Sequence, residues 1–339
     1  SRRQRQMCIR DSAYTAFDKV PGAAEETDRL LREAEQDAAS KGVVGIRDYE
    51  MAENIDTWTN RFAAGINGLR VDAGVYPERL RAAIDAGWHT GNPLPGSAGL
   101  GHVGAMKLIS DGSLNTRSAY CSTPYSGIEP PTYGTLSYTP QQIEDYMRLA
   151  TEHGFDIACH AIGDEANTIA LNAVAATHAH GSIEHAQMLK PVDIPRFAEL
   201  GLTASIQPQH AMDDRDVITR FWANPAGIPY PFRALHDAGT TLRMGSDAPV
   251  APLDPWLAIS AAVFGSESSD REPFQPEQCL DVRTSLAAST ATGRDRLASG
   301  DPADMVLLDA DPYAADTPEA MRAMPQHVVM TLLCGERTY

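Results

Sequence analysis

The sequence has 339 residues, of which 43% are hydrophobic and 22% charged, a composition typical of a globular protein with a substantial core. Its formal net charge of −17 repels phosphate backbones and anionic lipid heads, so we expect no nucleic-acid or membrane partner and a small neutral or cationic substrate. The sequence contains no long apolar run, no secretory signal and no CxxC pair among its five cysteines. We therefore expect a soluble, cytoplasmic protein with reduced thiols, although a targeting signal encoded upstream would not be visible here.

Helical and strand-like segments alternate from residue 24 onward. The periodicity and the Pro and Gly positions predict helices over 24–40, 52–65, 77–87, 140–153, 164–178, 191–200 and 229–238. Apolar runs predict strands near 43–48, 69–75, 103–109, 155–159, 182–186, 202–207 and 240–246. This alternation indicates an α/β protein with a parallel sheet, either doubly wound or closed as a (β/α)8 barrel. We favour the barrel, one strand short of eight, because polar residues at successive strand ends converge only if the strands curve into a ring.

The two ends of the chain depart from this pattern. Residues 1–12, SRRQRQMCIRDS, concentrate arginine in an acidic protein and have no periodicity, so we expect them to be foreign to the fold, with a native basic arm as the alternative. Near the other end, helical patterns at 254–265 and 276–291 precede two alternating strands within 301–311 and 326–334. The predicted division is therefore a foreign or disordered N-terminus over 1–12, a barrel domain over 13–298 and two further strands over 299–339.

Lys107 interrupts the apolar run HVGAMKLI. A buried ammonium group needs a partner, and one interpretation is a lysine at the edge of the core that pairs with Asp111. The other is a neutral lysine that takes up carbon dioxide and bridges metal ions as a carbamate.

Two histidines occupy equivalent positions on successive strands. His160 follows FDIAC, and His185 ends the segment SIEH one strand later. The carboxyl ends of barrel strands meet where active sites form, and imidazole is a common ligand for Zn, Ni, Mn or Fe. We therefore predict that the pair binds a metal, although a single strand-end histidine is more often structural.

Asp247 and His210 follow the last two strands. Asp247, in MGSDAPV, is able to bind a metal and to accept a proton from metal-bound water, or else it forms a turn or caps a helix. His210, in SIQPQHAMDD, is expected in a loop, where it either faces the substrate or has no role.

Six segments together resemble one known family, the amidohydrolase-3 group of the amidohydrolase superfamily, which includes YtcJ-like and N-substituted formamide deformylase-like proteins. They are MKLISDGSLNTRSAY, CHAIGDEANTIALNAV, SIEHAQML, SIQPQHAMDD, MGSDAPV and GDPADMVLLDADPY, and they follow the family's order within residues 40–339. The resemblance implies one or two divalent ions, with zinc expected, and carbamylated Lys107 as a bridging ligand. It further implies His160 and His185 as ligands of one metal, Asp247 as ligand of the other and proton shuttle, and His210, Asp111 and Arg117 as substrate-binding residues.

One family feature is missing. Members carry an HxH pair at the end of the first barrel strand, and the sequence has only His178-Ala179-His180, at the end of a mid-barrel helix. We therefore expect an N-terminally truncated fragment that lacks the first strand and most of a β-sandwich domain, of which residues 299–339 would be the remainder.

The sequence thus predicts a metal-dependent hydrolase of non-peptide C–N bonds in amides, formamides or cyclic amides, acting through metal-activated hydroxide. Ester or phosphoester hydrolysis on the same site is the first alternative, because fold and metal do not fix the bond that is cleaved. A non-catalytic barrel or an inactive fragment is the second, and we expect the chain as written to be poorly folded and inactive. The partner is expected to be a small amide-type molecule, and formation of a homo-oligomer is left open.

Overall fold

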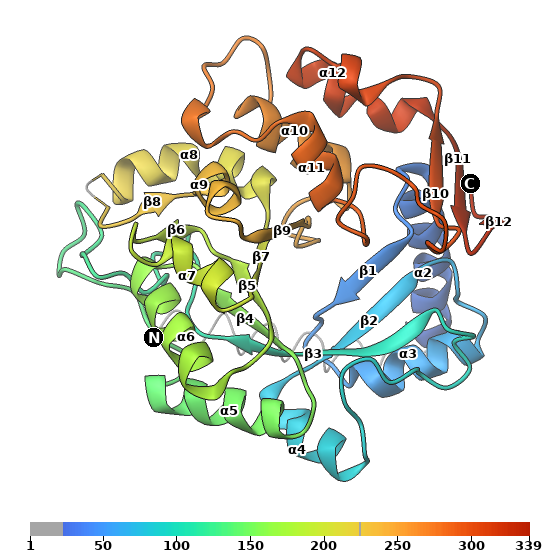
Figure 1. The fold of residues 1–339 in the computed structure, drawn as a ribbon, viewed down its shortest axis with the longest axis horizontal. Helices are drawn as coiled ribbons and strands as arrows, with labels where there is room; N and C mark the ends of the chain where they lie inside the picture. The colour runs from blue at the N-terminus through green and yellow to red at the C-terminus, as the bar shows by residue number, and fades with distance from the viewer. Residues whose placement is uncertain (1–22, 224) are drawn as a thin grey trace.

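A parallel sheet of seven strands is the centre of the computed structural model, which describes residues 23–223 and 225–339 (Figure 1). The strands are β1 (Gly45–Asp48), β2 (Arg70–Val75), β3 (Gly101–Ile109), β4 (Ile157–Ala161), β5 (Gly181–His185), β7 (Thr203–Ile206) and β9 (Thr241–Met244). They follow one another across the sheet in chain order, and the sheet curves into a half-barrel. All seven predicted strands are confirmed. A doubly wound sheet is excluded, because its strand order reverses at a switch point and this one does not.

The register separates an apolar face of the sheet from a polar one. One row of aligned residues runs through Leu108, Cys159, Ile183, Ala204 and Leu242, all of them buried. Because neighbouring residues on a strand point to opposite faces, the adjacent positions form a second row on the inner, concave face. That second row is mainly polar, since it aligns Ile109 with His160, Glu184, Ser205 and Arg243, and Lys107 lies on the same face two residues before Ile109.

Helices cover the apolar face. They are α3 (Asn54–Ala63), α4 (Pro77–Asp85), α5 (Pro140–Glu152), α6 (Asp164–Thr177), α7 (Ile194–Glu199) and α9 (Phe232–Asp237). The main core cluster joins buried side chains of these helices, such as Leu80, Met147 and Phe197, to the apolar row of the sheet. Helix α5 begins as the sequence predicts, because Thr139 and Gln142 exchange the two hydrogen bonds of a capping box.

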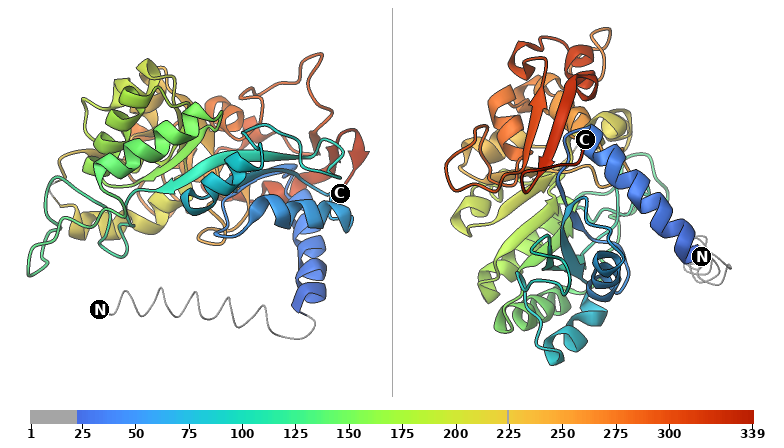
Figure 2. Two further views of the ribbon diagram at one scale, coloured as in Figure 1. Left: turned by 90° about the horizontal axis from the view of Figure 1, so that it is seen from below. Right: turned by 90° about the vertical axis from the view of Figure 1, so that its right-hand side faces the viewer.

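Helix α2 (Ala23–Ser40) projects from the body of the molecule (Figure 2). Its carboxyl end is anchored, since Ala38 and Ala39 are buried and the hydroxyl of Thr331 donates a hydrogen bond to the carbonyl of Ala39. Among the described residues, no helix is both long enough and apolar enough to cross a membrane. The predicted foreign segment 1–12 lies outside the described residues.

The C-terminal part packs against α8 and β9 and reaches the first strands of the sheet (Figure 1). It consists of α10 (Pro255–Phe264), η1 (Pro276–Gln278), α11 (Val282–Ala288), β10 (Met305–Leu308), η2 (Pro312–Ala314), α12 (Pro318–Arg322), η3 (Met324–His327), β11 (Val328–Leu333) and β12 (Glu336–Arg337). Strands β10, β11 and β12 form an antiparallel sheet. A salt bridge of 2.5 Å between Arg70 Nε and Asp304 Oδ2 joins this small sheet to β2.

Three elements differ from the sequence prediction. A helix, α8 (Pro208–Phe221), follows β7 where a loop was predicted, because Pro208 is well suited to the first helical position. Residues 228–231 are not helical, since β8 (Ile228–Pro229) pairs with β6 (Met188–Leu189). The predicted helix over 276–291 is shortened, because Asp281 caps α11 at its Thr284 amide.

Candidate functional site

The carboxyl end of the half-barrel collects the polar side chains that the sequence analysis selected. Strand pairing aligns Lys107 with Ala158 and His160 with Glu184. Since side chains two residues apart on a strand share a face, Lys107, His160 and Glu184 all lie on the inner face. The site therefore rests on three paired strands, β3, β4 and β5, whose backbone positions are fixed by the sheet.

His185 ends β5 and would point away from the inner face in a regular strand. Its φ of 74° is uncommon for a residue other than glycine, and its ring centroid lies 4.5 Å from that of His160. The ring is buried, and its Nδ1 has no hydrogen-bond partner within the described part of the chain. Burial holds the pKa of His185 well below its usual value, and the nearby His160, Lys107 and His210 lower it further. His185 is therefore neutral, which is the form that binds metals.

Two more side chains approach His185 from the segments after β7 and β9. His210 is buried in the first turn of α8, and its ring stacks on that of His185 with centroids 6.1 Å apart. Asp247 is exposed and has a φ of 56°, and its Oδ2 lies 3.3 Å from His210 Nε2. Ligand atoms of His185, His210 and Asp247 all lie within 4.8 Å of one another. Two imidazoles and a carboxylate at this spacing fit a divalent metal ion.

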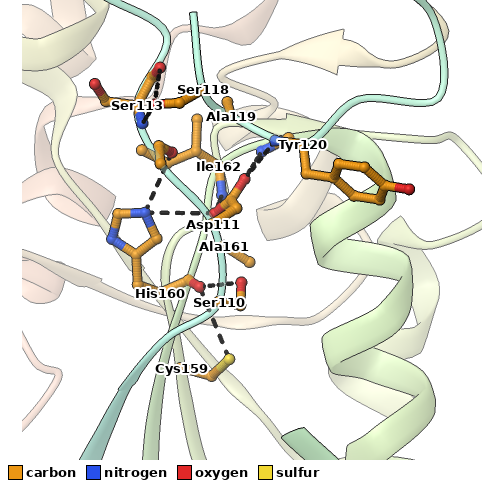
Figure 3. Close-up of polar contacts among 12 residues, drawn as sticks. Ser110, Asp111, Ser113, Ser118, Ala119, Tyr120, Cys159, His160, Ala161 and Ile162 are labelled. Atoms are coloured by element: carbon orange, nitrogen blue, oxygen red, sulfur yellow. Dashed lines mark hydrogen bonds and ion pairs between the residues drawn. The ribbon is translucent and has the colours of Figure 1, made fainter. Parts of the chain in front are cut away.

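His160 is held from its other side by Asp111 (Figure 3). The buried carboxylate of Asp111 accepts hydrogen bonds from the backbone amides of Tyr120, Ile162 and Gly163. Its Oδ1 lies 3.4 Å from His160 Nε2. Asp111 thus fixes the loop that contains Tyr120 and orients the imidazole of His160. The structure directs this carboxylate into the protein, and its predicted contact with a substrate stays a prediction.

Lys107 and Arg117 each lie against an aromatic ring. Lys107 is buried, and its Nζ is 4.9 Å from the centroid of the Tyr49 ring. Asp111, considered as its ion-pair partner, is engaged by backbone amides and His160. The guanidinium carbon of Arg117 lies 5.2 Å from the centroid of Phe221. Carbamylation of Lys107 and substrate binding by Arg117 stay predictions.

The sequence analysis missed Asp214 and the helical setting of His210. Asp214 lies one turn after His210 on α8, where it is buried and accepts hydrogen bonds from Asn115 Nδ2 and Tyr230 Oη. Burial raises the pKa of the Asp214 carboxyl above its usual value. The available signal was Pro208, which favours the first turn of a helix.

One family model and two named proteins are similar in sequence to this chain. The model of a family described as the amidohydrolase family matches residues 6–339. YtcJ of Bacillus subtilis, named as an amidohydrolase, is 29% identical over 322 residues, which cover 87% of this chain and 59% of the relative. N-substituted formamide deformylase of Arthrobacter pascens is 25% identical over 240 residues, which cover 64% and 42% of the two chains.

A solved structure is similar to this chain in both fold and sequence. It is a metal-dependent hydrolase of Pyrococcus horikoshii, described as uncharacterized, with a TM-score of 0.63 and 27% sequence identity. The match covers 74% of this chain and 50% of that one. The chain thus spans about half the length of the proteins that it matches.

Proposed function

Because the chain belongs to the amidohydrolase family, we propose that it provides the metal site of a hydrolase for non-peptide carbon–nitrogen bonds in small molecules such as amides, formamides or cyclic amides. Two comparisons support the proposal. One relative is a formamide deformylase by name, and one similar solved structure is described as a metal-dependent hydrolase. The charge of −17 is consistent with a neutral or cationic substrate and disfavours phosphorylated ones.

The observation that carries the proposal is buried His185 beside Asp247, because the Nδ1 atom of His185 has no hydrogen-bond partner among the described residues. A buried imidazole nitrogen without a partner costs free energy, and a bound metal ion removes that cost. Asp247 contributes a carboxylate at the solvent-exposed mouth. We assign Lys107 and His160, on the same inner face, as further ligands, with zinc as the expected ion and carbamylated Lys107 as the bridge if two ions bind.

The residues of the site suit hydrolysis. When bound, the metal lowers the pKa of a coordinated water and polarises the carbonyl that is attacked. Asp247, exposed at the mouth, would take the proton from the attacking water and pass it to the leaving nitrogen. Arg117 and the loop held by Asp111 would line the pocket, where they orient the substrate.

We also propose that the half-barrel is the larger part of a (β/α)8 barrel domain over 13–298. Strands β1 and β9 are the two edges of the parallel sheet, and one more parallel strand between them would close the ring. The antiparallel sheet β10–β11–β12, within residues 299–339, would belong to a β-sandwich domain.

An assay of amide hydrolysis tests the proposed function. The 339-residue chain and any longer product of its gene are supplied with zinc and given N-formyl and N-acyl amines, together with matched esters and phosphoesters. We expect turnover of the amines by the longer product that chelation removes and His185→Ala abolishes, and none by the 339-residue chain. Turnover of esters alone, or amide turnover that survives both chelation and His185→Ala, would contradict the proposal.

A further inference from the structure

We propose that residues 112–118 form a strap across the carboxyl mouth of the half-barrel, and that a hydrogen bond between Asn115 and Asp214 is the latch that holds the strap in place. The latch limits the access of substrates to the buried histidines of the mouth. The inference rests on the proposed function in one respect, because it takes this mouth as the place where the substrate binds. It concerns access alone and changes none of the proposed metal ligands.

The strap starts at the ends of β3 and β4. Asp111 directly precedes it, and the carboxylate of Asp111 accepts hydrogen bonds from the backbone amides of Ile162 and Gly163, just after β4 (Figure 3). Within the strap, the carbonyl oxygen of Gly112 lies 3.4 Å from Nε2 of His160. The first residue of the strap is therefore held beside the imidazole at the end of β4.

The tip of the strap reaches the far side of the mouth. Nδ2 of Asn115 donates a hydrogen bond of 2.5 Å to Oδ1 of Asp214, which lies on α8. Helix α8 follows β7, and the strand order places β4 and β5 between β3 and β7. A segment that runs from the end of β3 to α8 therefore crosses the carboxyl ends of β4 and β5, where His160 and His185 lie.

The strap is braced by its own backbone. The amide of Gly112 donates to the carbonyl of Ser118, and the amide of Ser118 donates to the carbonyl of Ser113. Leu114 is buried in the main core. The strap is thus one closed turn, and its tip at Asn115 is the part whose position depends on the latch.

The acceptor of the latch is fixed from its other side. Asp214 is buried, and its Oδ2 accepts a hydrogen bond of 2.7 Å from Oη of Tyr230, which is also buried. The backbone amide of Tyr230 donates in turn to the carbonyl of Gln187, two residues after His185. Because Asp214 is held in this way, it keeps its place when the tip of the strap moves.

A second contact between the strap and α8 is weaker than the latch. The guanidinium carbon of Arg117 lies 5.2 Å from the centroid of the Phe221 ring. A partly exposed cation–π contact stabilises less than a hydrogen bond to a buried carboxylate. Loss of the latch therefore loosens the tip of the strap and widens the mouth above His160 and His185.

Chemical modification of histidines in the metal-free 339-residue chain tests the latch. Diethyl pyrocarbonate acylates accessible imidazoles, and mass spectrometry of peptides gives separate rates for His160, for His185 and for exposed His236. We expect Asn115→Ala and Asn115→Asp to raise the rates at His160 and His185 by about tenfold, the effect of one lost charge-assisted hydrogen bond, with His236 unchanged. Asp213→Asn removes an exposed carboxylate from the same helix and should change none of the rates.

A reciprocal exchange distinguishes loss of the latch from a general loosening of the fold. Adding Asp214→Asn to Asn115→Asp restores one donor and one acceptor with their roles reversed, and we expect rates within about twofold of the wild type. Cys159, buried on the opposite face of β4, should resist iodoacetamide in every variant.

Three results would overturn the inference. They are unchanged histidine rates in both Asn115 variants, no recovery in the exchanged pair, and faster labelling of Cys159 alongside the histidines. Access that depends on the latch, without amide turnover by any product of the gene, would leave this inference standing and refute the proposed function.

Discussion

The two halves of the sheet's carboxyl edge differ in whether selected buried polar atoms have hydrogen-bond partners. At the end of β3 and β4, the carboxylate of Asp111 is fully engaged by three backbone amides and the ring of His160. At the ends of β5 and β7, the buried atoms His185 Nδ1, Gln187 Oε1 and Gln207 Oε1 have no partner within the described chain. The carboxylate of Asp111 is thus satisfied, and these three atoms are not.

This difference separates a supporting role from a binding role. Buried polar atoms are nearly always hydrogen-bonded, because an unpaired one costs about 1–3 kcal/mol. Natural sequences keep such a cost mainly where a ligand removes it. We therefore interpret Asp111, after β3, as a residue that positions the site, and His185, at the end of β5, as a residue that binds the ion.

The largest expected effect concerns stability at the satisfied end. Asp111→Ala leaves three buried backbone amides without their acceptor, so we expect the free energy of unfolding to fall by about 3 kcal/mol or more. Asp247→Ala removes an exposed carboxylate and should change it by less than about 0.5 kcal/mol. Urea unfolding of both variants measures the difference. Equal losses in the two variants would remove the distinction between the two halves.

The next effect concerns stabilisation by metal at the unsatisfied end. With free zinc at about 100 times its dissociation constant, the free energy of unfolding should rise by about 2.7 kcal/mol, because zinc binds the folded chain. The same addition should not stabilise Asp247→Ala, which lacks one of the proposed metal ligands. Thermal or urea unfolding with and without a chelator measures the shift, and magnesium serves as the control ion. Equal zinc stabilisation of both proteins would place the ion elsewhere.

The smallest effect concerns thiol reactivity. Burial raises the pKa of Cys159, on the apolar face of β4, to about 12, so its reactive thiolate is scarce at pH 8. Cys334 is exposed in the turn after β11. We expect iodoacetamide at pH 8 to modify Cys334 while Cys159 stays unmodified, as read from peptides by mass spectrometry. Equal rates at the two cysteines would show that the β4 end opens readily, contrary to its role as the rigid half.

Local signals in the sequence were sufficient to predict the parallel strands and the start of α5. Apolar runs predicted all seven parallel strands, because their outer faces are buried under helices. Thr139, Pro140 and Gln142 predicted the start of α5, since a cap depends only on its own turn. Short helices and two-residue strands such as β6 and β8 were missed, because long-range pairing determines them.

The orientation of the site residues could not be predicted from the sequence. His160 and His185 were expected near each other, and their rings are 4.5 Å apart, but the positive φ that turns His185 has no sequence signature. Asp111 was assigned to a pocket wall, and only the tertiary structure shows that backbone amides surround its carboxylate. The partnership of His210 with Asp247 joins two segments 37 residues apart and follows from the curvature of the sheet.

The central claim is that the carboxyl mouth of the half-barrel holds a metal ion, and diffraction from crystals grown with zinc tests it most directly. Anomalous differences at the zinc absorption edge locate the ion without reference to activity. We predict the strongest peak at the mouth of the half-barrel, about 2.0–2.1 Å from a ring nitrogen of His185, with the other ligands drawn from the proposed set of Asp247, His160 and Lys107. Peaks confined to surface carboxylates, with the mouth empty at saturating zinc, would contradict the account.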